Sequence, residues 1–169
     1  MNIMSLDTPS RPIYEHRQIG WVMLASAWAP ILCLAAIWIF TPSAQRSLPP
    51  FLVPGLAIAT ALVLVSFSSM SVAVTPTHVV ARFGLRLPKR TVTIDDIASA
   101  SIVRTHWYEG WGIHWTSRGM LYNVAGCEAV RLERANGRAI MFGTDEAKRL
   151  LAAIERARLD RHARSIKGY

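Results

Sequence analysis

Histidine, glutamate and tryptophan side chains gather between positions 106 and 115, and they are the residues of this chain best suited to chemistry. His106, Glu109 and His114 carry the imidazole and carboxylate groups that zinc accepts as ligands. Metal-binding helices use close spacings such as i and i+4, whereas these two histidines are eight residues apart with glycines between them. A metal-dependent enzyme built on the three residues is therefore kept as an alternative, and we predict no metal and no cofactor.

The same segment contains Trp107, Trp111 and Trp115. Tryptophan is a usual residue of binding hot spots and of membrane interfaces, so these rings could contact a partner or a bilayer. They could equally fill the core of a small β-barrel, because the glycines beside them allow tight backbone bends. The sequence leaves core, interface and ligand site open for this aromatic segment.

A second group of candidate contact residues is basic. Positive side chains near a membrane can contact anionic headgroups, at about 1 kcal/mol per residue. They can also be ordinary solvated charges, and the two interpretations stay open. The chain carries a net charge of +8, but its charges are dispersed and no nucleic-acid motif accompanies them, so we expect no nucleic acid partner. The basic candidates are Arg82, Arg86, Lys89 and Arg90.

Motifs of known enzymes are missing from the sequence. No nucleophile elbow, Walker A loop or dinucleotide-binding glycine pattern occurs. The acidic pair Asp95-Asp96 is typical of a turn. We therefore predict that the protein is not an enzyme and has no catalytic residues.

The elements that must position these residues begin with a long uncharged stretch. No charged residue occurs between Arg17 and Arg46, and none between Arg46 and His78. The apolar runs 20–40 and 51–70 within it reach the roughly 20 residues that a helix needs to cross a bilayer. The sequence predicts two transmembrane helices, paired as an antiparallel hairpin over residues 19–71. Small residues in the second run favour close helix packing, within the hairpin or across a dimer face.

Basic residues near the ends of the runs predict the orientation. The connecting loop carries only Arg46, whereas Arg11 and Arg17 precede the first run and more basic residues follow the second. By the positive-inside rule, both termini should be cytoplasmic. We expect a tail over residues 1–18, a β domain over 72–160 and a basic tail over 161–169.

The sequence after the hairpin predicts short strands and one helix. Apolar residues alternate at Val79, Ala81 and Phe83, and Asn136-Gly137 is the preferred pair for a type I′ turn between two strands. An apolar stripe beginning at Ala147 predicts a helix to about Leu159. The predicted fold class is thus a two-span membrane hairpin plus a small, mainly β barrel or sandwich capped by a C-terminal helix.

This layout resembles the bacterial pleckstrin-homology-like membrane proteins over about residues 72–159. The residues that carry the resemblance are Gly110-Trp111-Gly112-Ile113, the segment 118–126 (RGMLYNVAG), Asn136-Gly137-Arg138 and Phe142-Gly143-Thr144-Asp145-Glu146. The resemblance implies a bacterial inner-membrane location and a pleckstrin-homology-like domain. It implies no reaction. Eukaryotic relatives of the fold often bind phosphoinositides through basic residues between early strands, but the spacing here carries over no ligand site.

The function predicted from these features is a non-enzymatic binding or scaffold module. It would be an integral inner-membrane protein whose cytoplasmic β domain recognises a protein partner or anionic headgroups. The alternatives are a structural subunit of a membrane complex assembled through the helix hairpin, a homo-oligomer included, and the metal-dependent enzyme described above.

Overall fold

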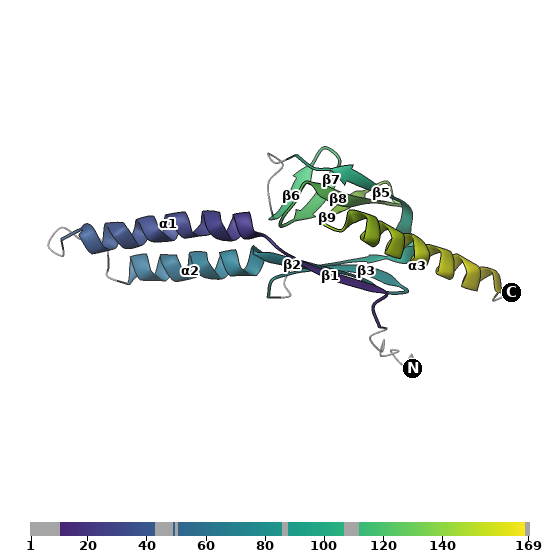
Figure 1. The fold of residues 1–169 in the computed structure, drawn as a ribbon, viewed down its shortest axis with the longest axis horizontal. Coiled ribbons are helices and arrows are strands. Elements are labelled where there is room, and N and C mark those ends of the chain that lie inside the picture. The colour runs from purple at the N-terminus through teal and green to yellow at the C-terminus, as the bar shows by residue number, and fades with distance from the viewer. Residues whose placement is uncertain (1–10, 43–48, 50, 86–87, 107–111, 168–169) are drawn as a thin grey trace.

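Two helices leave one side of a β body as a long hairpin in the computed structural model (Figure 1). The structure describes residues 11–42, 49, 51–85, 88–106 and 112–167. The chain begins with strand β1 (Tyr14–Ile19), continues into helix α1 (Trp21–Phe40), and returns through helix α2 (Leu52–Phe67) into strand β2 (Ser69–Val74). The hairpin is therefore inserted between two neighbouring strands of one sheet.

The body consists of two sheets and a long C-terminal helix. The first sheet has the order β1-β2-β3-β4, and the second has the order β5-β8-β9-β7-β6. Within the second sheet β7 and β9 run parallel, while the other pairs are antiparallel. The remaining elements are β3 (His78–Phe83), β4 (Lys89–Thr93), the 3-10 helix η2 (Ile94–Asp96), β5 (Ile97–Arg104), β6 (Gly112–Thr116), β7 (Gly119–Asn123), β8 (Glu128–Arg134), β9 (Ala139–Gly143) and α3 (Ala147–Lys167).

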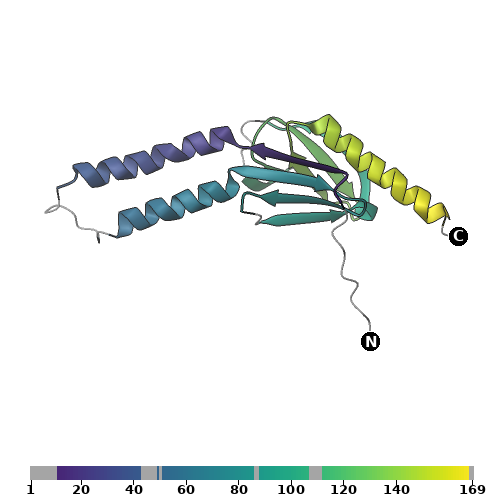
Figure 2. The same ribbon diagram turned by 60° about the horizontal axis from the view of Figure 1, so that its bottom comes forward.

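The main core lies between the two sheets and α3. Phe83 from the first sheet, Phe142 from the second and Leu150 from α3 belong to one buried cluster and are at most 2% exposed. Tyr122 joins the aromatic contacts between them, with its ring centroid 6.3 Å from that of Phe83 and 5.7 Å from that of Phe142. Figure 2 shows α3 on the side of the body away from the hairpin.

Helix α3 confirms the predicted apolar stripe but extends beyond its predicted end. Its buried positions include Ala147 and Ile154. The helix continues past Leu159 to Lys167 because side chains of its second half are held on the body. Arg158 donates to the carbonyl of Ala98 over 2.7 Å, and Arg161 forms an ion pair with Asp95.

Within the part of the chain that the structure describes, no helix combines the length and the apolar character needed to cross a membrane. Helix α2 has 16 residues, which rise about 24 Å against the roughly 30 Å of a hydrocarbon core. The second apolar run does not stay helical to Met70, because the chain enters β2 at Ser69.

This finding contradicts the two-span membrane hairpin of the predicted fold class. It also contradicts the predicted integral membrane function, the membrane as a partner, and the inner-membrane location with cytoplasmic termini. The mainly β part with a C-terminal helix agrees with the structure.

Candidate functional site

Three of the predicted basic residues lie on the last two strands of the first sheet, β3 and β4. Arg82 in β3 is directly opposite Lys89 in β4, and Ala81 is opposite Arg90. Lys89 and Arg90 are exposed on β4, which is the last strand of its sheet, whereas Arg82 is half-buried. The structure thus brings these three residues together, and Arg86 lies outside the described residues. Positive side chains on an edge strand also discourage pairing with further strands.

The aromatic segment is described only at its ends. Trp107, Glu109 and Trp111 lie outside the described residues. Trp115 stands on the edge strand β6 with 76% of its surface exposed, so it does not fill the core.

The two candidate histidines occupy different surroundings. His106 is exposed, whereas the ring of His114 is half-buried and its Nε2 finds no hydrogen-bond partner among the described residues. The described residues contain no group of three His, Cys, Asp or Glu side chains arranged to hold a metal ion.

The surface that stands out physically is the α1–α2 hairpin. Along each helix, half-buried positions recur at helical spacing, as at Ile31 and Trp38 in α1 and at Ala57 and Leu64 in α2. Positions with this spacing lie on one face of a helix, and here they face the other helix. None of the residues of α2 is buried. The two helices therefore cover only one narrow side of each other.

Large apolar side chains cover the rest of the hairpin. Fourteen of them are 44% to 83% exposed. At about 150 Å² per large side chain, the low end of the range for aromatic residues, they expose on the order of 1,000 Å². The largest apolar patch on a typical monomer is about 300–600 Å², so this surface is unusually large. The side chains are Trp21, Val22, Trp28, Leu32, Ile37, Ile39, Phe40, Phe51, Leu52, Leu56, Ile58, Leu62, Val63 and Val65.

The hairpin is fixed at its base by the first sheet. The β1–β2 ladder runs from Tyr14 opposite Val74 to Ile19 opposite Ser69, and the amide of Gly20 continues it with a bond to the carbonyl of Ser68. Neither helix is joined to its strand by more than one residue. The direction of the hairpin therefore follows directly from the direction of the two strands.

A second support comes from the turn after β3. A Cβ added at Gly84 would lie 2.6 Å from the carbonyl oxygens of Val65 and Ser66, so only glycine fits against this end of α2. Next to it, the rings of Phe67 and Phe83 pack with their centroids 5.5 Å apart. The base of α2 is thus held by backbone and by aromatic contacts.

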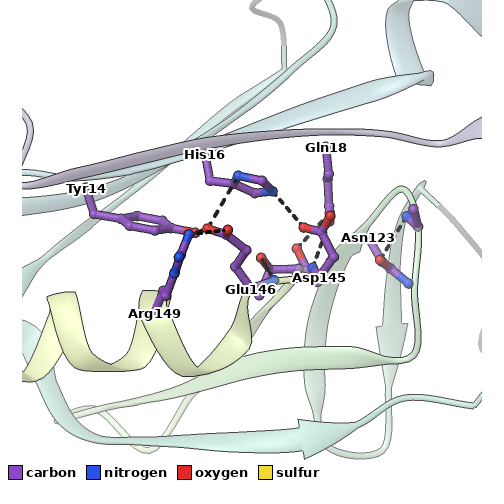
Figure 3. A network of polar contacts seen from close by, with 10 residues as sticks. Tyr14, His16, Gln18, Asn123, Asp145, Glu146 and Arg149 are labelled. Atoms are coloured by element: carbon purple, nitrogen blue, oxygen red, sulfur yellow. Dashed lines mark hydrogen bonds and ion pairs between the residues drawn. The ribbon is translucent and has the colours of Figure 1, made fainter.

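Polar side chains join β1 to the start of α3 (Figure 3). Tyr14, His16 and Gln18 alternate along β1, so they share one face of the strand. Gln18 is 5% exposed; its Nε2 donates to the carbonyl of Gly143 over 2.8 Å, and its Oε1 accepts from the amide of Asp145 over 3.2 Å. The polar joint below means Tyr14, His16 and Gln18 of β1 together with their partners Gly143, Asp145 and Glu146.

His16 lies between two carboxylates in the polar joint. Its Nε2 is 2.7 Å from Asp145 Oδ1, and its Nδ1 is 3.5 Å from Glu146 Oε2. Arg149 also pairs with Glu146, at 2.7 Å. The arrangement ties the hairpin-bearing strand to the helix that closes the body.

The same acids act on Tyr14. Its hydroxyl donates to Glu146 Oε2 over 3.3 Å. Partial burial, followed by the negative charge of Glu146, raises the pKa of Tyr14 to about 12. The phenol therefore stays protonated and donates its hydrogen bond to Glu146. This contact helps to hold β1 on the residues that precede α3.

No family model matches the chain, and no curated protein matches it in sequence. The resemblance to pleckstrin-homology-like proteins stays a prediction that nothing here tests.

Sequence reasoning missed β1 and therefore the polar joint. Residues 14–18 belong to the predicted N-terminal tail, and Ile19 to the predicted hairpin. Apolar and polar residues do not alternate here, and the one periodic feature is that charged Glu15 and Arg17 alternate with Tyr14, His16 and Gln18.

Proposed function

We propose that this protein is a non-enzymatic subunit of a protein assembly, in which the α1–α2 hairpin is the docking element. The observation that carries the proposal is the exposed apolar surface of the hairpin. A helix that is apolar all round is normally buried, and no other described element of this chain covers it. Covering it with protein removes on the order of 1,000 Å² from water, more than the roughly 800 Å² per partner of a standard interface.

The charge pattern describes the partner. Neither helix contains a charged residue, so the hairpin offers no charge complementarity to a polar partner. Its match is another uncharged, apolar helical surface of similar length. The β body and the polar joint then hold the hairpin in a fixed direction.

The basic residues at the edge of the first sheet have a supporting place in this proposal. Lys89 and Arg90 keep β4 from pairing with further strands, which restricts association to the hairpin. We propose no reaction and no cofactor for the chain.

The test is the molecular mass of the full chain in detergent-free buffer, by sedimentation equilibrium. We expect an assembly that falls apart in the double variant Leu32→Glu/Ile37→Glu, because both side chains are about 60% exposed on α1. Trp115→Glu is the matched control, since it also places a charge at an exposed apolar position, but on the body. The proposal is wrong if the wild-type chain neither self-associates nor binds another protein, or if the hairpin variant assembles as well as the control.

A further inference from the structure

One face of the hairpin carries apolar side chains at the spacing of a coiled-coil seam. On α1, exposed residues follow one another in steps of four and three. This is the heptad pattern, with a mean period of 3.5 residues, that brings side chains into register between packed helices. Two alanines stand among the large residues along it, which leaves space for side chains of a second such surface. The α1 residues are Trp21, Ala25, Trp28, Leu32, Ala35 and Ile39.

Helix α2 carries a matching stripe. Its members again follow steps of four and three, and all are exposed. An added Cβ at Gly55 would meet no atom within 4 Å, so this glycine is not needed for packing inside the protomer. It leaves room for a neighbouring helix instead. The stripe consists of Phe51, which directly precedes α2, and of Gly55, Ile58, Leu62 and Val65.

The two stripes lie on the same face of the hairpin. Two antiparallel helices are related by a two-fold axis perpendicular to their common plane. This axis preserves the direction of rotation along the chain. Residues that come one position after a contact residue therefore lie on the same side of the plane in both helices. Ile58 follows the contact residue Ala57 by one position, as Leu32 follows Ile31. Together the stripes form the seam face.

The opposite side of the hairpin carries fewer large apolar side chains. On α1, its described residues include Pro30 and Cys33, with Ile37 as a large apolar side chain. On α2 it carries Leu52, Leu56 and Val63, which are 44% to 58% exposed. These four large side chains compare with eight on the seam face. The tryptophans of α1, which are typical of interface centres, are on the seam face or against α2.

We propose that the seam face docks on the seam face of a second copy of this chain, which makes a four-helix arrangement about a two-fold axis. This rests on the proposed function and names its partner. The eight large side chains of the seam face are 50% to 73% exposed. They amount to roughly 750 Å² at about 150 Å² per side chain, close to the 800 Å² per partner of a stable interface.

Self-association follows from the character of the face. An isologous interface needs a self-complementary surface, and an uncharged heptad face with small residues among large ones meets that need. Two hairpins have the same length and the same heptad phase, so the large side chains of one copy can pack beside the small residues of the other. Packed antiparallel helix pairs of this kind are the units of four-helix bundles.

The chain offers a matched pair of substitutions. Ile58 and Leu56 lie on α2 on either side of its contact with α1, and they are 62% and 53% exposed. Ile58→Glu places a charge in the seam face, and Leu56→Glu places the same charge on the opposite side. Neither side chain is buried in the protomer, so both variants should fold like the wild type.

Sedimentation equilibrium of the full-length proteins, without detergent, gives the test. We expect a wild-type dimer, a Leu56→Glu dimer, and self-association of Ile58→Glu weakened by at least about 100-fold, the size of a hot-spot loss. Gly55→Leu should also weaken the dimer, because it fills the space left for the partner without adding a charge.

Each other outcome overturns the inference. Equal dissociation of Ile58→Glu and Leu56→Glu, in a larger assembly, would leave the proposed function standing but remove the seam face as its interface. An assembly with a different protein only, with the purified chain monomeric, would remove the second copy as the partner. A chain recovered only as a monomer bound to detergent or lipid vesicles would overturn both the inference and the proposed function.

Discussion

Gln18 offers the sharpest test of how the hairpin is held on the body. Its side chain is 5% exposed and bridges two backbone groups beyond its own strand, the carbonyl of Gly143 and the amide of Asp145. Gln18→Ala removes both partners. The carbonyl of the buried Gly143 then stays unsatisfied at about 1–3 kcal/mol, while the amide of exposed Asp145 can turn to water at a smaller loss.

We expect Gln18→Ala to lower the free energy of unfolding by about 2–3 kcal/mol. For a chain of this size that corresponds to a fall in Tm of about 5–10 °C. The measurements are urea unfolding followed by circular dichroism, and calorimetry, at one protein concentration because assembly would shift both. Glu15→Ala is the control, since this exposed side chain is on the other face of β1, and it should stay within about 0.5 kcal/mol of the wild type.

The variant Gln18→Glu separates hydrogen bonding from packing. A carboxylate of nearly the same shape can accept from the amide of Asp145 but cannot donate to the carbonyl of Gly143. It should be less stable than Gln18→Ala at pH 7, and should recover part of the loss near pH 4, where the acid becomes protonated and can donate. A Gln18→Ala protein within about 0.5 kcal/mol of the wild type would refute the polar joint as a source of stability. So would a Gln18→Glu protein that is more stable than Gln18→Ala at pH 7.

Three further predictions concern the base of the hairpin, the pH dependence and the core. Gly84→Ala forces an added Cβ against the carbonyls at the end of α2, so urea unfolding should show a loss of about 1–3 kcal/mol, and an unchanged midpoint would contradict the close contact. The pKa of Tyr14 is raised to about 12, so the unfolded chain loses this proton near pH 10 while the folded chain keeps it. Stability should therefore fall between about pH 10 and 12, and more steeply in the wild type than in Tyr14→Phe; parallel urea-unfolding profiles would argue against the shift. Phe142→Ala, at a position that is 0% exposed, should cost about 3–5 kcal/mol in the same assay, whereas Leu85→Ala, at a 63% exposed position, should cost less than about 0.5 kcal/mol.

Local patterns predicted the body of the fold well. The predicted hairpin joins β8 to β9, and the alternation of Val79, Ala81 and Phe83 places all three in the core, as expected. The turn itself is not the predicted type I′ pair: the amide of Gly137 bonds to the carbonyl of Arg134, which centres the turn on Ala135 and Asn136 and leaves Gly137 after it with φ +75°. In each case the signal is contained in a few neighbouring residues, because a turn type or a strand face depends on local backbone geometry.

Features that depend on contacts between distant parts of the chain, or on a partner, could not be predicted from the sequence. An uncharged run such as residues 20–40 shows that a surface avoids water, but a bilayer and a protein partner leave the same composition. Strand β1 was not predicted because four of its six residues are polar or charged. The reason for its polar face is visible only once Asp145 and Glu146 are known to lie opposite it, 127 or more residues away along the chain. The order of the strands likewise depends on contacts that no local pattern records.

The insertion of the hairpin between β1 and β2 also has a consequence for the kinetics of folding. Gln18 pairs with Met70 across about fifty residues, and closing so long a flexible loop is slow and entropically costly. If α1 and α2 pair first, they bring Gly20 and Ser68 together. The strands β1 and β2 can then pair from that end without closing the long loop again. The hairpin would then be the nucleus of the first sheet. Variants that weaken the contact between the helices, such as Ala57→Gly, should slow refolding more than they speed unfolding.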